Sequence, residues 1–152
     1  MVQRRCRDSG LQDLGVSNWR FISTVLKEQQ EPIYYIGSDS AFMIYPMSDG
    51  KVYYYAQIID ENKTFLNTDA KQSLEKIFRN YAPEVLQSIK DLDNEEIISG
   101  SLSSVINTYY PHKNIALIGD ALHGCPPSLQ QGVGMGVEDA GLSSCSFFLI
   151  SR

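Results

Sequence analysis

The residues best suited to chemistry in this 152-residue chain lie near its carboxyl end. Asp120 follows Gly119 directly after the apolar run 115–118, and a proline-containing loop then leads to a glycine-rich segment around Gly132. A continuous apolar run predicts a buried strand of a parallel sheet, and such sheets bind ligands beyond the carboxyl ends of their strands. Asp120 could accept hydrogen bonds from ligand hydroxyls there, while a helix beginning near Gly132 would offer N–H groups to an anion. The pair predicts a site for a cofactor that contains sugar and phosphate.

The helix of this site is predicted to run from about residue 132 to about residue 148. One mainly apolar stripe of this helix would carry Val133, Val137, Ala140, Ser144 and Phe147. Gly134 and Gly136 would each cost the helix roughly 1 kcal/mol relative to alanine. Two explanations remain open for these glycines: close approach of a flat ring or a sugar chain to the first turn, or close packing of the helix on strand 115–118.

Two other chemistries can be drawn at the same residues. Asp120, His123 and Cys125 could be three metal ligands, but the chain has only two histidines and no fourth ligand follows at a metal-like spacing. Cys125 as a nucleophile with His123 as its base would lack a third residue to orient the pair. We therefore expect no metal site, and no side chain can be named as a catalytic acid, base or nucleophile.

The same segment resembles the FAD-dependent aromatic-ring hydroxylases, the flavin monooxygenases of the p-hydroxybenzoate hydroxylase type. Their second FAD motif runs Gly-Asp-Ala-Ala-His, Pro-Pro, Gly-Gln-Gly, Asn and Glu-Asp-Ala. The chain matches it at eleven positions within about 26 residues, namely Gly119, Asp120, Ala121, His123, Pro126, Pro127, Gln131, Gly132, Glu138, Asp139 and Ala140. It departs at Leu122, Gln130 and Gly134, where the family has alanine, glycine and asparagine. If the family backbone needs a positive φ at position 130, glutamine is strained there, which would displace the loop or degrade the site.

The resemblance implies a cofactor and a reaction. It implies an oxidoreductase, a flavoprotein that uses FAD, with NAD(P)H as co-substrate and O₂, to hydroxylate an aromatic or heteroaromatic small molecule. The implied cofactor-binding residues are Gly119, Asp120, Pro127, Gln131, Gly132, Val133 and Gly134. Asp120 would bond the ribityl chain, the loop after Pro127 would cover the ring, and the helix N–H groups would face its pyrimidine edge. His123 would be a structural hydrogen-bonding residue, while helix charge and packing account for Glu138 and Asp139.

One half of the family's cofactor site is not found in the sequence. Residues 1–40 contain no Gly-x-Gly-x-x-Gly turn, and the string 132–137 has valine in place of the third glycine. The chain is therefore expected to be a carboxyl-side fragment, inactive alone, that works with an amino-terminal half from a longer or separate chain. Truncation, frameshift and a mis-called start remain open as its origin. The alternative is a non-catalytic remnant or interaction module that binds no flavin, so whether the chain is itself an enzyme stays open.

The sequence predicts an α+β fold, with an antiparallel substrate-domain sheet and a strand-loop-helix piece of an incomplete, Rossmann-like FAD-binding domain. The expected divisions are a frayed lead-in over 1–18, a substrate-type sheet domain with helices over 19–108, and a partial FAD-binding domain over 109–152. In the family a sheet of this kind covers the flavin ring, and the tyrosine-rich sheet predicted here is compatible with an aromatic substrate. The plainer interpretation of the tyrosines is that they alternate between the two faces of a sheet.

Local patterns predict the individual elements. Short aromatic and β-branched runs at 32–36, 41–47 and 51–59, with an Asp49-Gly50 turn, indicate an antiparallel meander. Apolar spacing predicts a helix over 68–81 that Thr68 or Asp69 could cap. The sequence further predicts a short helix that begins at Pro83, a strand near 96–99 and a turn over 111–114.

Composition limits the partners. A net charge of −5 disfavours nucleic acid and anionic membranes, and no apolar run has transmembrane length. The three cysteines form no CxxC pair, so reduced thiols in a cytoplasm are expected. The substrate, the choice between NADH and NADPH, and the oligomeric state are not determined by the sequence.

Overall fold

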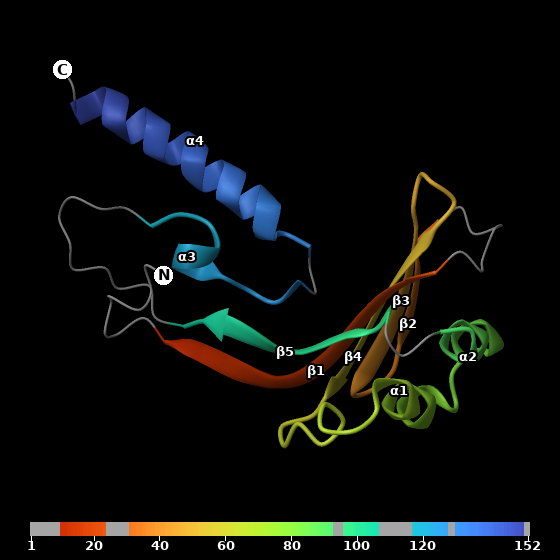
Figure 1. Ribbon diagram of the computed structural model, residues 1–152. Coiled ribbons are helices and arrows are strands. Elements are labelled where there is room, and N and C mark those ends of the chain that lie inside the picture. Colours follow the sequence, from red (N-terminus) through yellow and green to blue (C-terminus); the bar gives the residue numbers. More distant parts are fainter. Residues whose placement is uncertain (1–9, 24–30, 93–95, 107–116, 128–129, 151–152) are drawn as a thin grey trace. The chain divides into compact units, whose positions relative to one another are not determined.

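The computed structural model describes residues 10–23, 31–92, 96–106, 117–127 and 130–150, with the side chains of the last helix described as far as Ser143. The chain has an α+β architecture built on one five-stranded sheet, as the sequence predicts (Figure 1). It divides into two compact units, one formed by residues 15–102 and the other by residues 1–14 together with 103–152.

The sheet has the strand order β2-β3-β4-β1-β5. The strands are β1 (Leu11–Ser23), β2 (Ile33–Ile36), β3 (Ser40–Pro46), β4 (Val52–Ile59) and β5 (Ile98–Val105). Neighbours β2 and β3, β3 and β4, and β4 and β1 pair antiparallel. The turn between β3 and β4 closes with a 2.8 Å bond from Met47 N–H to the Lys51 carbonyl, and Gly50 adopts φ +76°. The predicted meander and its Asp-Gly turn are therefore confirmed.

Two helices cover one face of the sheet in residues 15–102. They are α1 (Ala70–Phe78) and α2 (Pro83–Lys90), which begin at an Asp69 side-chain cap and at Pro83, as predicted. The core they form with the sheet is made of Trp19, Phe21, Phe42, Ile44, Tyr54, Leu74, Phe78, Val85 and Ile89, all at most 2% exposed. Because fully buried apolar side chains of this size each stabilise a fold by about 1.5–3 kcal/mol, this unit has a substantial core of its own.

The prediction of a frayed lead-in over residues 1–18 is wrong for its second part, because β1 begins at Leu11. The polar residues that weaken the strand pattern have distant partners. Ser17 Oγ donates to Asp60 Oδ2 at 2.8 Å, and Asn18 Nδ2 donates to the Gly100 carbonyl at 2.9 Å. At these two buried positions, hydrogen bonds to distant residues take the place of apolar contacts. A search for alternating apolar residues therefore does not detect this part of the strand. The two compact units divide the chain after Leu14 in β1 and after Leu102 in β5.

The predicted strand 115–118 is not found where the structure describes it. Residues 115 and 116, like the predicted turn 111–114, lie outside the described residues, while Leu117 and Ile118 are not in a strand. Ile118 is 46% exposed rather than buried. The physical reason is that no described strand pairs with this segment, and an extended run without a paired neighbour has neither a hydrogen-bonded ladder nor a covered face.

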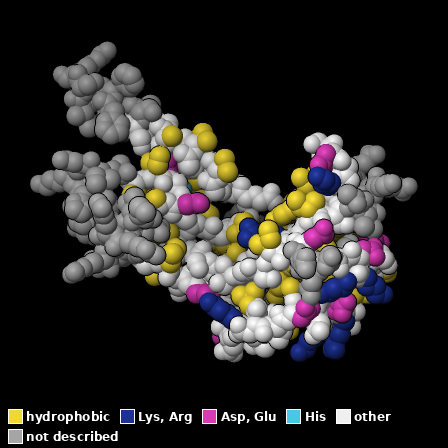
Figure 2. Space-filling view, viewed as in Figure 1, with side chains coloured by type: hydrophobic (Ala, Val, Ile, Leu, Met, Phe, Trp, Pro, Cys, Tyr) yellow, Lys and Arg dark blue, Asp and Glu magenta, His cyan; other side chains and the backbone are white. Residues whose placement is uncertain are grey.

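The carboxyl-side unit ends in a long helix. A single turn, α3 (Asp120–His123), follows Gly119, and α4 runs over Gly132–Ile150, close to the predicted bounds. The predicted apolar stripe is exposed in its described part, since Val133 and Val137 are 83% and 67% exposed. Figure 2 shows apolar side chains lying open along the described part of α4.

Candidate functional site

The candidate site lies in the carboxyl-side unit, where the chain turns at Gly119. This glycine has φ +59° and ψ −144°, a conformation in which a side chain would be strained. The turn places Asp120 at the start of α3, and the loop through Pro126 and Pro127 then carries the chain to α4. A glycine before Asp120 is thus required by the backbone, not merely tolerated.

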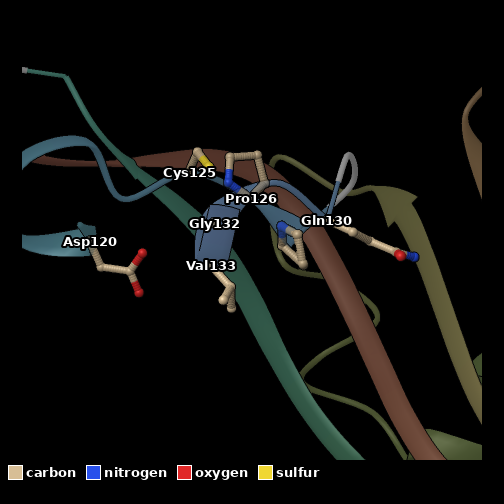
Figure 3. A pocket seen from close by; sticks show the side chains of 7 residues that line it. Asp120, Cys125, Pro126, Gln130, Gly132 and Val133 are labelled. Carbon is tan, nitrogen blue, oxygen red and sulfur yellow. The ribbon is translucent and has the colours of Figure 1, made fainter. Parts of the chain in front are cut away.

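A pocket of about 540 Å³ opens between α3, the proline loop and the first turn of α4 (Figure 3). The Asp120 side chain points toward the side of the pocket where α4 begins. Its Oδ1 lies 3.9 Å from where a Cβ on Gly132 would stand, so Gly132 leaves room beside the carboxylate. The lining residues are Asp120, Cys125, Pro126, Pro127, Gln130, Gly132 and Val133.

The structure brings four of the seven predicted cofactor-binding residues to this pocket: Asp120, Pro127, Gly132 and Val133. The other three are not among its lining residues. Gly119 lies against α4, with a Cβ placed on it 4.0 Å from Gly136 Cα. The carbonyl of Gln131 accepts the Met135 N–H at 2.9 Å, and a Cβ on Gly134 would stand 3.8 Å from Gln131 Oε1. The role of all seven in cofactor binding stays a prediction.

Gln130 occupies a left-handed conformation, with φ +55°. A non-glycine residue in this region costs roughly 1–2 kcal/mol relative to its ordinary conformations. The Gln130 N–H also closes a turn onto the Pro127 carbonyl at 2.9 Å, so the loop holds the residue in place. The backbone of Gln130 therefore has the positive φ that the sequence analysis expected to be strained for a glutamine.

The sequence missed a role for Asp139. Its Oδ2 accepts a hydrogen bond from Gly119 N–H at 2.8 Å and lies 2.6 Å from His123 Nε2. The Gly119 N–H and then the His123 ring lower the pKa of the Asp139 carboxyl below its ordinary value. Helix charge does not account for a side chain aimed at the turn of α3. The sequence showed only that the Gly-Asp, His and Glu-Asp-Ala segments have the spacing of the family motif. That these segments contact one another can be seen only in the folded structure.

His123 is a structural hydrogen-bonding residue, as its place in the motif implies. Its Nε2 is engaged by Asp139, and its Nδ1 is buried without a hydrogen-bond partner among the described residues. Over the same described part of the chain, no group of three or more His, Cys, Asp or Glu side chains is placed to hold a metal ion.

The sheet of residues 15–102 carries aromatic side chains on the face opposite α1 and α2. Tyr54 is buried among the core residues, whereas its neighbours Tyr53 and Tyr55 alternate to the other face, with Tyr55 paired opposite Arg20. Burial chiefly raises the pKa of the Tyr55 hydroxyl to about 12, Tyr53 adds to the rise and Arg20 opposes it. A hollow of about 270 Å³ on this unit is lined partly by Arg20, Tyr53 and Ile98.

A family model described as FAD binding domain matches residues 5–143. The match covers most of the chain and includes the whole candidate site, so the chain belongs to the FAD binding domain family. None of the curated proteins compared with the chain matches it in sequence. In the described residues, no helix combines the length and apolar character that crossing a membrane requires.

Solved structures share the fold at low sequence identity. Klebsiella pneumoniae HpxO, complexed with FAD and uric acid, has a TM-score of 0.74 and 22% identity over 87% of this chain. A salicylate hydroxylase substrate complex has a TM-score of 0.69 and 20% identity over 90% of the chain. For 2,6-dihydroxypyridine-3-hydroxylase from Arthrobacter nicotinovorans the values are 0.69 and 12% over 86%. The chain spans only 35%, 39% and 42% of these three proteins, respectively.

Proposed function

We propose that this chain forms the carboxyl-side part of an FAD-dependent monooxygenase that hydroxylates an aromatic or heteroaromatic small molecule with NAD(P)H and O₂. The observation that carries the proposal is the placement of Asp120. Its side chain faces the start of α4 in a pocket, and no other described residue donates a hydrogen bond to the carboxylate. A carboxyl group that accepts no hydrogen bond from the described residues and is held beside a helix start suits a ligand that brings its own hydroxyl donors.

The residues around this pocket fit the ribityl and ring part of FAD. Asp120 would accept a hydrogen bond from a ribityl hydroxyl. The N–H groups of Gly132, Val133 and Gly134 precede the bond from Met135 N–H to the Gln131 carbonyl, so they lie ahead of the repeating bonds of α4. These groups and the positive end of the helix favour negative charge on a bound ligand. These contacts would come from Asp120, Gly132, Val133 and Gly134. The cofactor-binding roles of Gly119, Pro127 and Gln131 stay predictions.

When bound, FAD would supply the redox chemistry that activates O₂ after reduction by NAD(P)H. The contribution of this chain is to bind, orient and shield. Pro126 and Pro127 stiffen the loop along one side of the pocket, and a stiff apolar wall keeps water away from a bound ring at little entropic cost. No described side chain has been assigned a proton-transfer role.

The sheet supports an aromatic substrate. Tyr53 and Ile98 offer apolar surface in the hollow of this unit, and Arg20 adds a cationic group beside them. Aromatic rings pack well on such surfaces, and a guanidinium can pair with an acidic or carbonyl substituent of the ring. HpxO was solved with uric acid, and a salicylate hydroxylase with its substrate, so structures with this fold do bind ring compounds.

We further propose that catalysis needs an amino-terminal FAD-binding half. The chain spans 35–42% of the three solved neighbours, and Ile118, Val133, Val137 and Leu142 leave apolar surface exposed in the carboxyl-side unit. Exposed apolar surface favours association with a partner that covers it. The exposed free thiol of Cys125 is consistent with a reducing cytoplasm, which we propose as the location.

A non-catalytic remnant or interaction module remains the second candidate, and one observation favours it. Gln130 is held at φ +55°, where the family has glycine, so the wall of the pocket carries strain that the family pattern avoids. The coding DNA upstream separates the two candidates. An open frame that encodes Gly-x-Gly-x-x-Gly favours the monooxygenase, and its loss favours the remnant.

The direct test supplies the missing half. The 152-residue chain would be fused behind an amino-terminal FAD-binding half taken from a family member, and FAD affinity would be measured by flavin fluorescence. Asp120→Ala should weaken FAD binding by about ten- to a hundred-fold, because a charge-assisted hydrogen bond contributes about 1.5–3 kcal/mol. Glu138→Gln, an exposed change on α4, should leave the affinity nearly unchanged. Equal affinity of wild type and Asp120→Ala would remove the basis of the proposal.

A further inference from the structure

Asp139 connects two walls of the candidate pocket through a single oxygen atom. It lies on α4, yet its Oδ2 accepts a hydrogen bond from the Gly119 N–H at 2.8 Å and lies 2.6 Å from the His123 ring. Gly119 immediately precedes α3, and His123 is the last residue of α3. The contacts span 20 and 16 residues of sequence, so they fix the turn against the helix rather than stabilise either element alone. Both groups are only partly exposed, with 27% of the His123 side chain and 21% of the Asp139 side chain accessible.

The peptide that Asp139 holds is the one immediately before Asp120. Gly119 has the left-handed φ of +59°, and its backbone approaches Gly136 on α4, where a Cβ would stand 3.8 Å from Gly119 Cα. Two residues with no side chain thus allow the turn to lie against the helix, and the Asp139 bonds keep it there. Because Asp120 follows directly, its direction is set by the peptide that Asp139 anchors.

We propose that Asp139 is a positioning residue for cofactor binding. Its carboxylate sets the orientation of Asp120 relative to Gly132 and Val133, which form the opposite wall of the pocket. The inference deepens the proposed function and rests on it, since Asp120 is the residue proposed to bond the ribityl chain. Asp139 is not a lining residue and acts only through Gly119 and His123.

His123 serves as the second anchor of the same carboxylate. For Nε2 to donate to Asp139, the ring must carry a proton on that nitrogen, and Nδ1 has no partner among the described residues. Asp139 is therefore the only described group that orients the ring. The Gly119 N–H, and then the His123 ring, lower the pKa of the Asp139 carboxyl, which favours the ionised form of this acceptor.

The first experiment uses the 152-residue chain without flavin, labelled with ¹⁵N for NMR. In the wild type the Gly119 amide proton should appear at low field, because it donates to a carboxylate. Asp139→Ala should shift it upfield and lower the heteronuclear NOE of residues 119–123. Asp139→Asn, which retains an oxygen acceptor, should restore part of both signals, and Glu138→Ala should change neither. The Trp19 indole signal reports that the sheet remains folded in every variant.

An unchanged Gly119 amide and unchanged order over residues 119–123 in Asp139→Ala would overturn the inference. The second experiment adds riboflavin to the same samples and follows the amides of Asp120 and Val133. Loss of an orienting partner typically costs a binding site about ten-fold or more in affinity, as at metal ligands, so Asp139→Ala should bind about ten-fold more weakly and Glu138→Ala like the wild type. Equal riboflavin affinity in Asp139→Ala, despite a shifted Gly119 amide, would also overturn the positioning role.

Failure of the proposed function gives a different pattern. If riboflavin near its limit of solubility shifts neither Asp120 nor Val133 in the wild type, flavin binding by this pocket is refuted, and the cofactor role of Asp139 falls with it. The flavin-free spectra would still show whether Asp139 holds the turn. Failure of the positioning role therefore shows in the spectra of Asp139→Ala, whereas failure of flavin binding shows in the riboflavin titration of the wild type.

Discussion

Replacing Gln130 with glycine should relieve strain at the pocket, and replacing it with alanine should not. At φ +55° a residue with a Cβ pays roughly 1–2 kcal/mol. Glycine avoids this cost but loses roughly 0.5–1 kcal/mol in chain entropy. The net expectation is that Gln130→Gly is more stable than Gln130→Ala by about 0.5–1 kcal/mol. Comparing the two variants isolates the backbone effect, because both remove the same side chain.

Lys63 provides a matched control in the other unit. It is the second described non-glycine residue with a positive φ, at +54°, and it lies in a turn where its N–H donates to the Asp60 carbonyl. Lys63→Gly should likewise be more stable than Lys63→Ala. Only the substitutions at Gln130 should change riboflavin affinity, since Gln130 lines the pocket and Lys63 does not.

Amide hydrogen exchange measures the difference in local stability between Gln130→Gly and Gln130→Ala. The Met135 N–H, bonded to the Gln131 carbonyl, reports opening at the start of α4. A gain of about 1 kcal/mol slows its exchange about five-fold when exchange follows local opening. Equal or slower exchange in Gln130→Ala than in Gln130→Gly would refute the claim that the backbone at this position is strained. The observation that favours the non-catalytic remnant would then be lost.

Three further predictions follow from the structure and the proposed function. The purified 152-residue chain should be colourless and should not oxidise NADPH, because the ribityl contacts alone must offset the entropic cost of association; a stoichiometric flavin absorbance spectrum would contradict this. The exposed apolar residues of α4 should make the chain self-associate, which size-exclusion chromatography and dye binding can test; a compact monomer would count against it. Burial raises the pKa of Asp60, but hydrogen bonds from Ser17, Phe65 and Thr64 outweigh it and the net pKa is lowered. Its contribution to stability is therefore complete above the unfolded pKa near 3.9 and is lost as the pH falls through the folded value, so acid titration of unfolding should show a smaller loss in Asp60→Asn than in wild type.

The parts of the fold that the sequence predicts are those set by local patterns. The meander and its Asp49-Gly50 turn, the Asp69 cap of α1 and the start of α2 at Pro83 each depend on residues within a few positions of one another. The first part of β1 was missed because Ser17 is bonded to a residue 43 positions away. Periodicity measures apolar contacts along one element, so it cannot register a strand whose buried positions are satisfied by distant polar partners.

The site shows the same division. The motif predicted Asp120, Pro127, Gly132 and Val133, which line one pocket. It did not predict Asp139 as their support, because the contact requires the bend at Gly119 to bring the turn against α4. Residues that contact a ligand can be predicted from the residue types and spacing of a motif. The residues that orient them can be identified only when the path of the backbone is known.

The contacts that hold the pocket in shape determine how tightly the chain alone can bind a ligand. Asp139, Gly136 and Gly119 join its two walls. The end of β5 also supports the loop, because the Val105 N–H and the Ser104 Oγ donate to the Gly124 carbonyl at 2.8 and 3.1 Å. All of these residues belong to the carboxyl-side unit. A ligand held only here must meet the full entropic cost of association with a few hydrogen bonds, so we expect weak binding. If an amino-terminal half held the phosphate end of the same FAD molecule, the hydrogen bonds in this pocket would add to that binding without a second entropic cost of association. The affinity would then rise strongly although the shape of the pocket hardly changed.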